Sequence, residues 1–145
     1  MIDPTREQVA VALFALLSAV PGVNSSSRRP ALWDDSGAKP ALYMGNPEEN
    51  YLYPNGTATP PIITLDFDLF IYIDAGMDPN TTPDTQLNTL LDALETALAG
   101  PAINNYFQTL GGIVNHAWIE GAVRRVPGYL DGQGMVLLTI RVLVP

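Results

Sequence analysis

Cysteine is absent from this chain of 145 residues, and histidine occurs only once. Without cysteine the protein has no disulfide bonds, thiolate nucleophiles or cysteine-ligated metals. Charged residues are also scarce, at 15% of the sequence against about 25% in a typical globular protein. Because charge is depleted from the centres of protein interfaces, we expect other subunits to cover part of the surface. A surface that is polar but uncharged is the alternative explanation.

Basic residues are the rarer charged type, with seven Lys and Arg against fifteen Asp and Glu and a formal net charge of −8. Such a chain repels phosphate, which argues against tight binding of nucleic acid. The apolar stretch 9–20 is shorter than the ~20 residues of a membrane span, and its leading flank is mildly acidic, unlike a secretion signal. We therefore expect synthesis in the cytoplasm and no association with membranes.

Two amphipathic helices are predicted, over residues 4–20 and 83–99. Asp3 and Thr82 are suited to cap them, and in each case a proline follows at the first helical position. Pro21-Gly22 and Gly100-Pro101 end the two helices. Apolar residues recur at helical spacing at Val9, Leu13, Leu16, Leu17 and Val20, and at Leu87, Leu90, Leu91, Leu94 and Leu98.

Strands are predicted from alternation of apolar and polar residues, which is clearest from Ile63 to Asp74. At ~3.4 Å per residue this strand would run about 37 Å, so it either bends or projects beyond the domain. Residues 113–126 and 135–144 predict a C-terminal hairpin, and the polar residues 23–29 an edge strand. Together these elements predict one α+β domain over residues 1–145, with a mixed, mostly antiparallel sheet flanked by two main helices.

A long loop is predicted between Pro30 and Pro61, with brief strand-like pieces at residues 41–44 and 51–53. A connection of this length is unusual within a compact domain and is more often functional than idle. Its Trp33, Tyr51 and Tyr53 are candidates for an interface, because aromatic side chains bring large contact area with little rotamer entropy to lose. The alternative, that these aromatics pack on their own domain, stays open.

Three aspartates, Asp66, Asp68 and Asp74, fall on one face of the long predicted strand. They could suggest a cation site, but the sequence shows neither a further oxygen ligand nor a tight loop beside them. We therefore expect an acidic stripe that faces solvent or a channel.

Two arginine pairs, Arg28-Arg29 and Arg124-Arg125, contain four of the seven basic residues. In an acidic protein such pairs could bridge to carboxylates of another subunit, because arginine binds a carboxylate through two hydrogen bonds. Solvated charge at exposed strand ends is the alternative.

His116 is the single histidine, and it lies in a predicted strand with no cysteine to pair with. We expect a hydrogen-bonded structural or interface histidine rather than a catalytic base. No catalytic residue, cofactor or metal site is predicted. A small acidic hydrolase or metal-binding enzyme is the competing hypothesis from another functional class.

Several short segments follow one another along most of the chain in a recognisable order and spacing. They are Pro4-Thr5-Arg6, Ser27-Arg28-Arg29, Pro40-Ala41-Leu42-Tyr43, Leu90 to Glu95, Gln108 to Val114, Ile119-Glu120-Gly121 and Leu143-Val144-Pro145. This succession resembles the tail-terminator family of long-tailed bacteriophages, also described as minor tail or tail-completion proteins. Residues 46–61 match the family least well.

The resemblance implies a structural, non-enzymatic virion protein with an α+β fold. It implies a homo-oligomeric ring, a hexamer, that sits on the head-proximal end of the tail tube and stops tube polymerisation. The implied partners are further copies of the chain, the tail tube protein, a neck or head-completion protein and, if the tail is contractile, the sheath. Genomic DNA would only pass through the ring.

In such a ring, the candidates for contacts with other subunits or the tube would be the two arginine pairs, Trp33, Tyr51 and Tyr53. The candidates to face the bore would be Asp66, Asp68 and Asp74. Another neck protein beside the portal, such as a head–tail connector, stopper or adaptor, is the alternative assignment.

Overall fold

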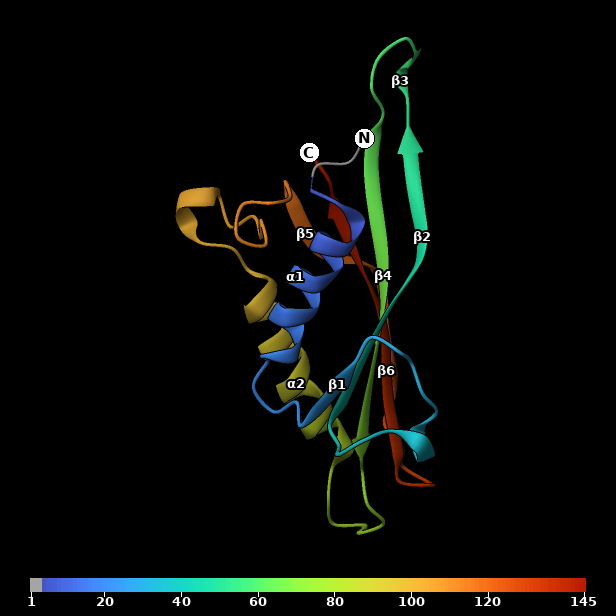
Figure 1. The fold of residues 1–145 in the computed structure, drawn as a ribbon. Helices are drawn as coiled ribbons and strands as arrows, with labels where there is room; N and C mark the ends of the chain where they lie inside the picture. Colours follow the sequence, from blue (N-terminus) through green and yellow to red (C-terminus); the bar gives the residue numbers. More distant parts are fainter. Residues whose placement is uncertain (1–3) are drawn as a thin grey trace.

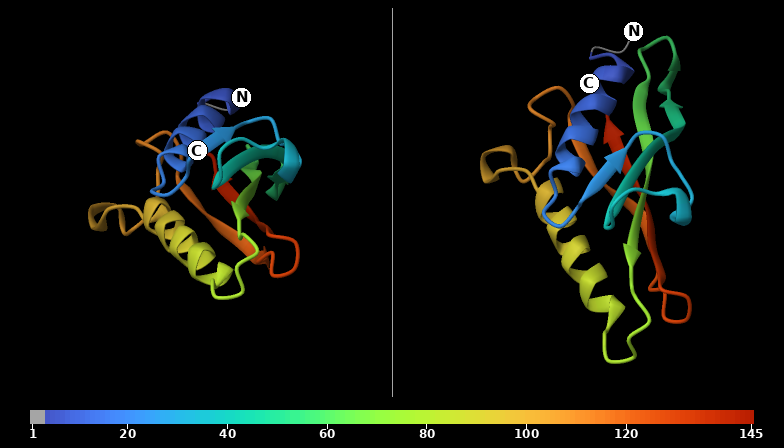
Figure 2. Two further views of the ribbon diagram at one scale, coloured as in Figure 1. Left: turned by 90° about the horizontal axis from the view of Figure 1, so that it is seen from below. Right: turned by 60° about the horizontal axis from the view of Figure 1, so that its bottom comes forward.

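The computed structural model describes residues 4–145, and in this part of the chain two α-helices cover one face of a five-stranded sheet (Figures 1 and 2). The strand order is β1-β2-β4-β6-β5, with β1 parallel to β2 and the other neighbours antiparallel. The bounds are α1 Arg6–Ser18, β1 Ser25–Ser27, β2 Ala41–Leu52, β4 Ile62–Asp74, α2 Pro83–Leu98, β5 His116–Val126 and β6 Gln133–Leu143. The connections contain strand β3 (Pro54–Thr57) and the 3-10 turns η1 (Trp33–Asp35) and η2 (Ala102–Asn104). The predicted α+β fold is confirmed.

The hydrophobic core lies between the helices and the facing side of the sheet. Side chains alternate between the two faces of a strand, so the odd-numbered residues of β4 and the even-numbered residues of β6 point toward the helices. The largest fully buried side chains are Phe67, Leu13, Leu17, Leu42, Met44, Leu65, Leu69, Ile73, Leu87, Leu94, Leu138 and Ile140. The whole buried core also contains Val9, Val20, Leu90, Leu98 and Ile71, and so includes most of the apolar positions predicted for α1, α2 and the long strand.

The start of α1 differs from the prediction. The helix begins at Arg6, and Thr5 rather than Asp3 is its N-cap. The Thr5 hydroxyl oxygen accepts from the backbone N–H of Gln8 at 3.2 Å, and the Gln8 side-chain oxygen accepts from the backbone N–H of Thr5 at 2.8 Å. This reciprocal capping box satisfies two free amides, so Pro4 precedes the helix instead of opening it. The predicted cap Asp3 lies outside the described residues.

The predicted long loop is wrong over much of its length, because residues 41–52 form the single strand β2. This strand pairs with β4 from Ala41 to Leu52, with a bulge between Gly45 and Glu48. Its outer half is mostly exposed, so side-chain burial imposes no apolar alternation there. Backbone hydrogen bonds to β4 hold this part of the strand, and such bonds leave no pattern in the order of side chains.

The second face of the sheet is partly covered by the connection between β1 and β2. Ala41, Tyr43 and Tyr72 form a small buried cluster there. The Tyr72 hydroxyl donates to the backbone oxygen of Ala31 at 2.7 Å, and burial raises the pKa of Tyr72. The packing fixes residues 31–37 against the sheet, beside the end of β4.

We predict that Leu94→Ala lowers the free energy of unfolding by about 2–5 kcal/mol, because it removes a buried side chain and leaves a cavity. Leu94 is 1% exposed in the centre of α2. The control is Leu91→Ala, the same change in the same helix at a partly buried position. Urea unfolding should show a clearly smaller loss for Leu91→Ala; equal losses would contradict this placement of the core.

Candidate functional site

The outer part of the β2–β4 hairpin, residues 46–63, projects beyond the rest of the domain and is called the arm here (Figure 1). At its base, the Arg6 guanidinium binds the Glu49 carboxylate at 2.5 Å and donates to the Tyr51 hydroxyl at 2.6 Å. Beyond this anchor the arm is exposed, with Leu52 at 60% and Ile62 at 44%. A two-stranded ribbon is only marginally stable in water, so an arm with exposed apolar side chains is suited to be covered by a partner.

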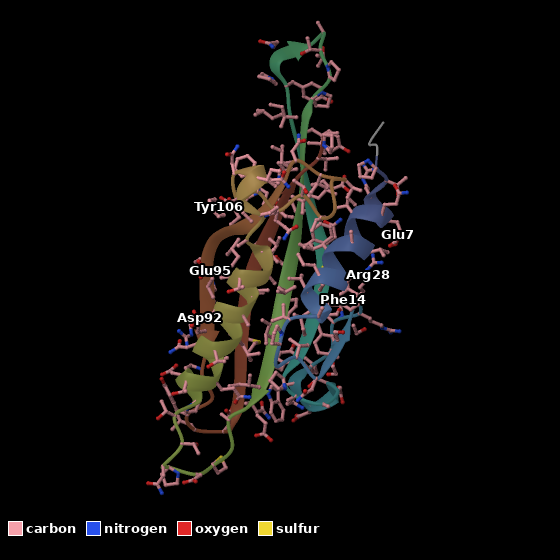
Figure 3. All side chains as sticks on the ribbon, turned by 90° about the vertical axis from the view of Figure 1, so that its left-hand side faces the viewer. Glu7, Phe14, Arg28, Asp92, Glu95 and Tyr106 are labelled. Carbon is pink, nitrogen blue, oxygen red and sulfur yellow. The ribbon has the colours of Figure 1, made fainter. Side chains whose placement is uncertain are left out.

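A second protrusion follows α2. Residues 101–107, called the knob here, contain η2 and stand out from the helix layer (Figures 1 and 2). Ile103 is 90% exposed, Tyr106 68% and Phe107 49%. Figure 3 shows Tyr106 near the C-terminal end of α2, whose outward face carries Asp92 and Glu95.

The two protrusions share an absence of charge. The sequence has no Asp, Glu, Lys or Arg from Asn50 to Leu65, which includes the outer arm, and none from Thr96 to Asn115, which includes the knob. The two protruding segments are thus among the three longest uncharged runs of the chain; the third, residues 8–27, covers most of α1 and all of β1. If another protein covers these two protruding segments, no charged side chain of theirs is removed from water.

The opposite end of the molecule is acidic. Asp74 ends β4, Asp78 follows in the next turn, Asp84 lies in the first turn of α2 and Asp131 lies in the β5–β6 connection. The backbone N–H of Ala75 donates to the oxygen of Gly132 at 2.8 Å, which holds these two connections together. Exposed apolar residues occur at this end too, but they stand among carboxylates. The long axis of the molecule thus has two chemically different ends.

The three candidate aspartates do share one strand face, but they do not form one open stripe. Asp66 is 6% exposed, and both its oxygens accept from the Arg141 guanidinium, at 2.8 and 3.1 Å. This hydrogen-bonded pair raises the pKa of Arg141. Asp68 accepts from the Thr139 hydroxyl at 3.0 Å, and Asp74 is exposed and accepts from a turn amide. The expectation that Asp66 is solvated is therefore wrong, because its charge is neutralised inside the sheet face.

The Asp66–Arg141 pair lies on the face of the sheet that the helices leave open. Glu120 approaches the same guanidinium at 3.5 Å and accepts from the Trp118 indole N–H at 2.6 Å. Removing either partner of such a pair is costly, because it leaves the other charge without compensation. The pair therefore fixes the register of β4 against β6.

Only one arginine of each pair forms an ion pair within the described chain. Arg28 binds Glu7 at 2.6 Å, and Arg125 lies 3.5 Å from Asp84; both pairs are largely exposed. Figure 3 shows Arg28 beside Glu7 near α1. Within residues 4–145, Arg29 and Arg124 have no ion-pair partner. Exposed pairs contribute only about 0–1 kcal/mol, so these arginines can exchange partners at little cost.

The candidate aromatics fall into two groups. The Trp33 indole N–H donates to the backbone oxygen of Ile73 at 2.9 Å, and the Lys39 ammonium lies 4.1 Å from the centre of its ring. Trp33 therefore packs on its own domain, as the alternative expectation had it. Tyr51 and Tyr53 remain 45% and 44% exposed on the arm.

His116 is held by stacking rather than by the expected hydrogen bond. Its ring lies between those of Phe107 and Trp118, with centroids at 4.4 and 4.9 Å. Its Nδ1 is buried and finds no hydrogen-bond partner among the described residues, and burial lowers the pKa of the side chain. The stack ties the root of the knob to β5.

Two shallow grooves, each of about 720 Å³, lie against the helices. The α2 groove lies at the N-terminal end of α2 and is lined by Pro21, Gly22, Pro40, Asp74, Ala75, Thr81, Thr82, Pro83, Thr85, Gln86, Thr89 and Leu90. The α1 groove lies along the exposed side of α1 and is lined by Pro4, Glu7, Gln8, Val11, Ala12, Ala15, Gly112, Ile113 and Pro145.

Residues 4–145 contain no group of three or more His, Asp or Glu side chains placed to hold a metal ion. None of the helices described is long and apolar enough to cross a membrane.

Several solved structures resemble this chain. One of them, a chain described as "Virion of native gene transfer agent (GTA) particle", superposes with a TM-score of 0.49 and 17% sequence identity, covering 99% of this chain and 96% of that chain. No protein-family model and no curated protein matches the sequence.

The sequence proposed Tyr51 and Tyr53 as interface candidates but did not point to Ile103, Tyr106 and Phe107, which are exposed as well. These three residues sit in an irregular segment after a helix, where no periodicity draws attention to them. The signal that could have found them is the long uncharged run from Thr96 to Asn115.

We predict that His116→Phe reduces the loss of stability on acidification. Because burial lowers the pKa of folded His116, the unfolded chain takes up this proton at a higher pH than the folded chain. Its contribution is thus complete above the unfolded pKa, about 6.5, and declines as the pH falls through that value. Urea midpoints at about pH 7.5 and pH 5 should drop less in the variant than in the wild type; equal drops would contradict a buried neutral histidine.

Proposed function

We propose that this chain is a structural virion protein of a long-tailed bacteriophage. In the finer form of the proposal, six copies form a ring on the head-proximal end of the tail tube. The ring stops tube polymerisation and presents a docking surface to a neck or head-completion protein. The order and spacing of the segments that resemble tail terminators support this assignment, and the α+β fold is the one that the resemblance implies.

The observation that carries the proposal is the difference between the two ends of the molecule. The arm projects at one end, with no charged residue from Asn50 onward and with exposed apolar side chains, while aspartates gather at the other end. A subunit that ends a polymer needs this asymmetry. One surface must bind the last tube ring, and the opposite surface must refuse a further tube subunit.

Ring closure would supply the stability of the assembly. In a closed ring of head-to-tail contacts, each copy is held by two neighbours at the same time. Contacts that would be weak between two isolated copies therefore become stable in the ring. The anchor of Arg6 on Glu49 and Tyr51 holds the base of the arm in one direction. This lowers the entropy that the arm loses when a neighbour covers it.

The remaining partner assignments follow from the same proposal. Arg29 and Arg124 are the arginines best placed to reach carboxylates of a neighbour or of the tube, because the described chain does not engage them in ion pairs. Asp68 and Asp74 remain candidates to face the bore, through which DNA would pass. The sheath is a further partner if the tail is contractile.

We predict that the purified protein limits the length of growing tail tubes. Tube protein polymerised with the chain should give shorter tubes than tube protein alone, with added density at one end in negative-stain images. The control is the double variant Leu52→Asp and Ile62→Asp, which charges the exposed arm without touching the core. It should stay folded and lose the effect, because burial of a new charge is costly.

Two results would contradict the assignment. Tubes of unchanged length with no end density would remove the terminator role, and binding to isolated portal rings instead would favour the connector or stopper alternative. Measurement of the native mass alongside would show whether the ring forms before it meets the tube.

A further inference from the structure

We propose that the knob of one copy docks in the α2 groove of the next copy, so that the ring is built from one repeated head-to-tail contact. The inference rests on the proposed ring and names the surfaces that form it. The knob exposes apolar side chains on a backbone that is held by hydrogen bonds within the segment.

The knob is preorganised. The backbone N–H of Tyr106 donates to the oxygen of Pro101 at 3.1 Å, and that of Gly100 donates to the oxygen of Tyr106 at 3.0 Å. The chain crosses itself closely here, since a Cβ on Gly100 would lie 1.9 Å from the backbone oxygen of Phe107. A surface fixed before binding loses little conformational entropy when it binds.

The knob also holds backbone strain. Asn105 and Tyr106 have φ values of 54° and 64°, in the left-handed region, which a bulky residue such as tyrosine rarely adopts. Such strained conformations cluster at functional sites. Here the strain turns a tyrosine outward, 68% exposed, where its side chain is available to a partner.

The α2 groove suits this occupant in charge. Of the described residues that line it, Asp74 alone is charged, and its carboxylate already accepts from the backbone N–H of Gly76 at 3.0 Å. The knob lies in a run without charged residues. An uncharged protrusion in this groove covers a single charged group, the Asp74 carboxylate, which keeps its hydrogen bond, whereas an acidic surface would repel a second copy.

The α2 groove also offers polar partners. Thr82 occupies the N-cap position of α2 as predicted, but within the described chain its side chain makes no cap hydrogen bond. Asparagine oxygens are among the preferred acceptors for the free amides of a first helical turn. Asn104 and Asn105 at the tip of the knob bring such oxygens.

The two surfaces are different parts of the chain, so the contact between them is head-to-tail. The knob follows the C-terminal end of α2 and the α2 groove lies at its N-terminal end, about 24 Å apart along sixteen residues of helix. Two different surfaces of one chain make a head-to-tail contact, which closes into a ring when the rotation between successive copies allows it. The α1 groove instead contains Gly112 and Ile113, close in the chain to the root of the knob, which favours reciprocal pairing of two copies.

The absence of cysteine allows a direct test. Ile103→Cys places a thiol on the knob, and Gln86→Cys places one in the α2 groove. Both positions are exposed, and in each single variant the new thiol is the only one of the chain. Mixed under mild oxidation at concentrations where the wild-type chain is a ring by native mass, the two variants should form a disulfide-linked dimer on a non-reducing gel. The double variant should form a ladder of linked copies. Val11→Cys in the α1 groove is the matched control and should not link to Ile103→Cys.

Efficient linking of Ile103→Cys to Val11→Cys or to itself would overturn the inference. So would no Ile103–Gln86 linkage in a chain that forms a ring and caps tail tubes, which would leave the proposed function standing. A chain that neither self-associates at any concentration nor caps tubes would overturn both.

Tyr106→Gly separates an interface role from a structural one. Glycine relieves the left-handed strain and removes the exposed ring, so the monomer should unfold at the same or a higher temperature while ring formation weakens at least tenfold. A lower unfolding temperature with unchanged association would show that Tyr106 serves only its own fold, and would overturn the inference.

Discussion

The placement of β4 between β2 and β6 is the constraint on which the rest of the structure depends. Its helix-facing side chains, with Phe67 at the centre, form the middle of the core. On its other face, Asp66 binds Arg141 and fixes the pairing with β6, since a register slip of one residue would turn every side chain to the wrong face. Because β4 is longer than the layer of helices that covers it, its first residues leave the core and, with the end of β2, become the arm (Figure 1).

The distribution of charge connects this architecture to the proposed assembly. Of the three longest uncharged runs, residues 8–27 form most of α1 and all of β1, whereas residues 50–65 and 96–115 include exposed protrusions. Evolution of a free monomer would favour charge on protruding segments, because charge keeps surfaces soluble. Exposed apolar side chains on an ordered arm and a strained knob are better explained by surfaces that another protein covers. The acidic opposite end then distinguishes the two faces that a terminal ring requires.

Elements with one buried side were predicted from the sequence, because burial makes their apolar residues recur at a regular spacing. Segments without a buried side were not predicted. The leucines of α2 and the alternation of β4 follow directly from one buried side. The outer half of β2 has no buried side, so its pairing was mistaken for a loop. The pairing of Asp66 with Arg141 joins residues far apart in the chain, and the placement of His116 between Phe107 and Trp118 depends on how the knob folds back. Tyr51 and Tyr53 could be identified because aromatics in a polar segment are unusual, whereas Tyr106 stood out only once its exposure and backbone conformation were known.

Hydroxyl-radical footprinting of the six tyrosines, in the free protein and in assembled particles, tests the central claim that the uncharged protrusions are covered by protein. Tyr43 and Tyr72 are buried and serve as internal references. The account predicts that Tyr51, Tyr53 and Tyr106 are oxidised readily in the free chain and become protected on assembly. If these three tyrosines are oxidised equally in both states, the protrusions are not interfaces and the account is wrong.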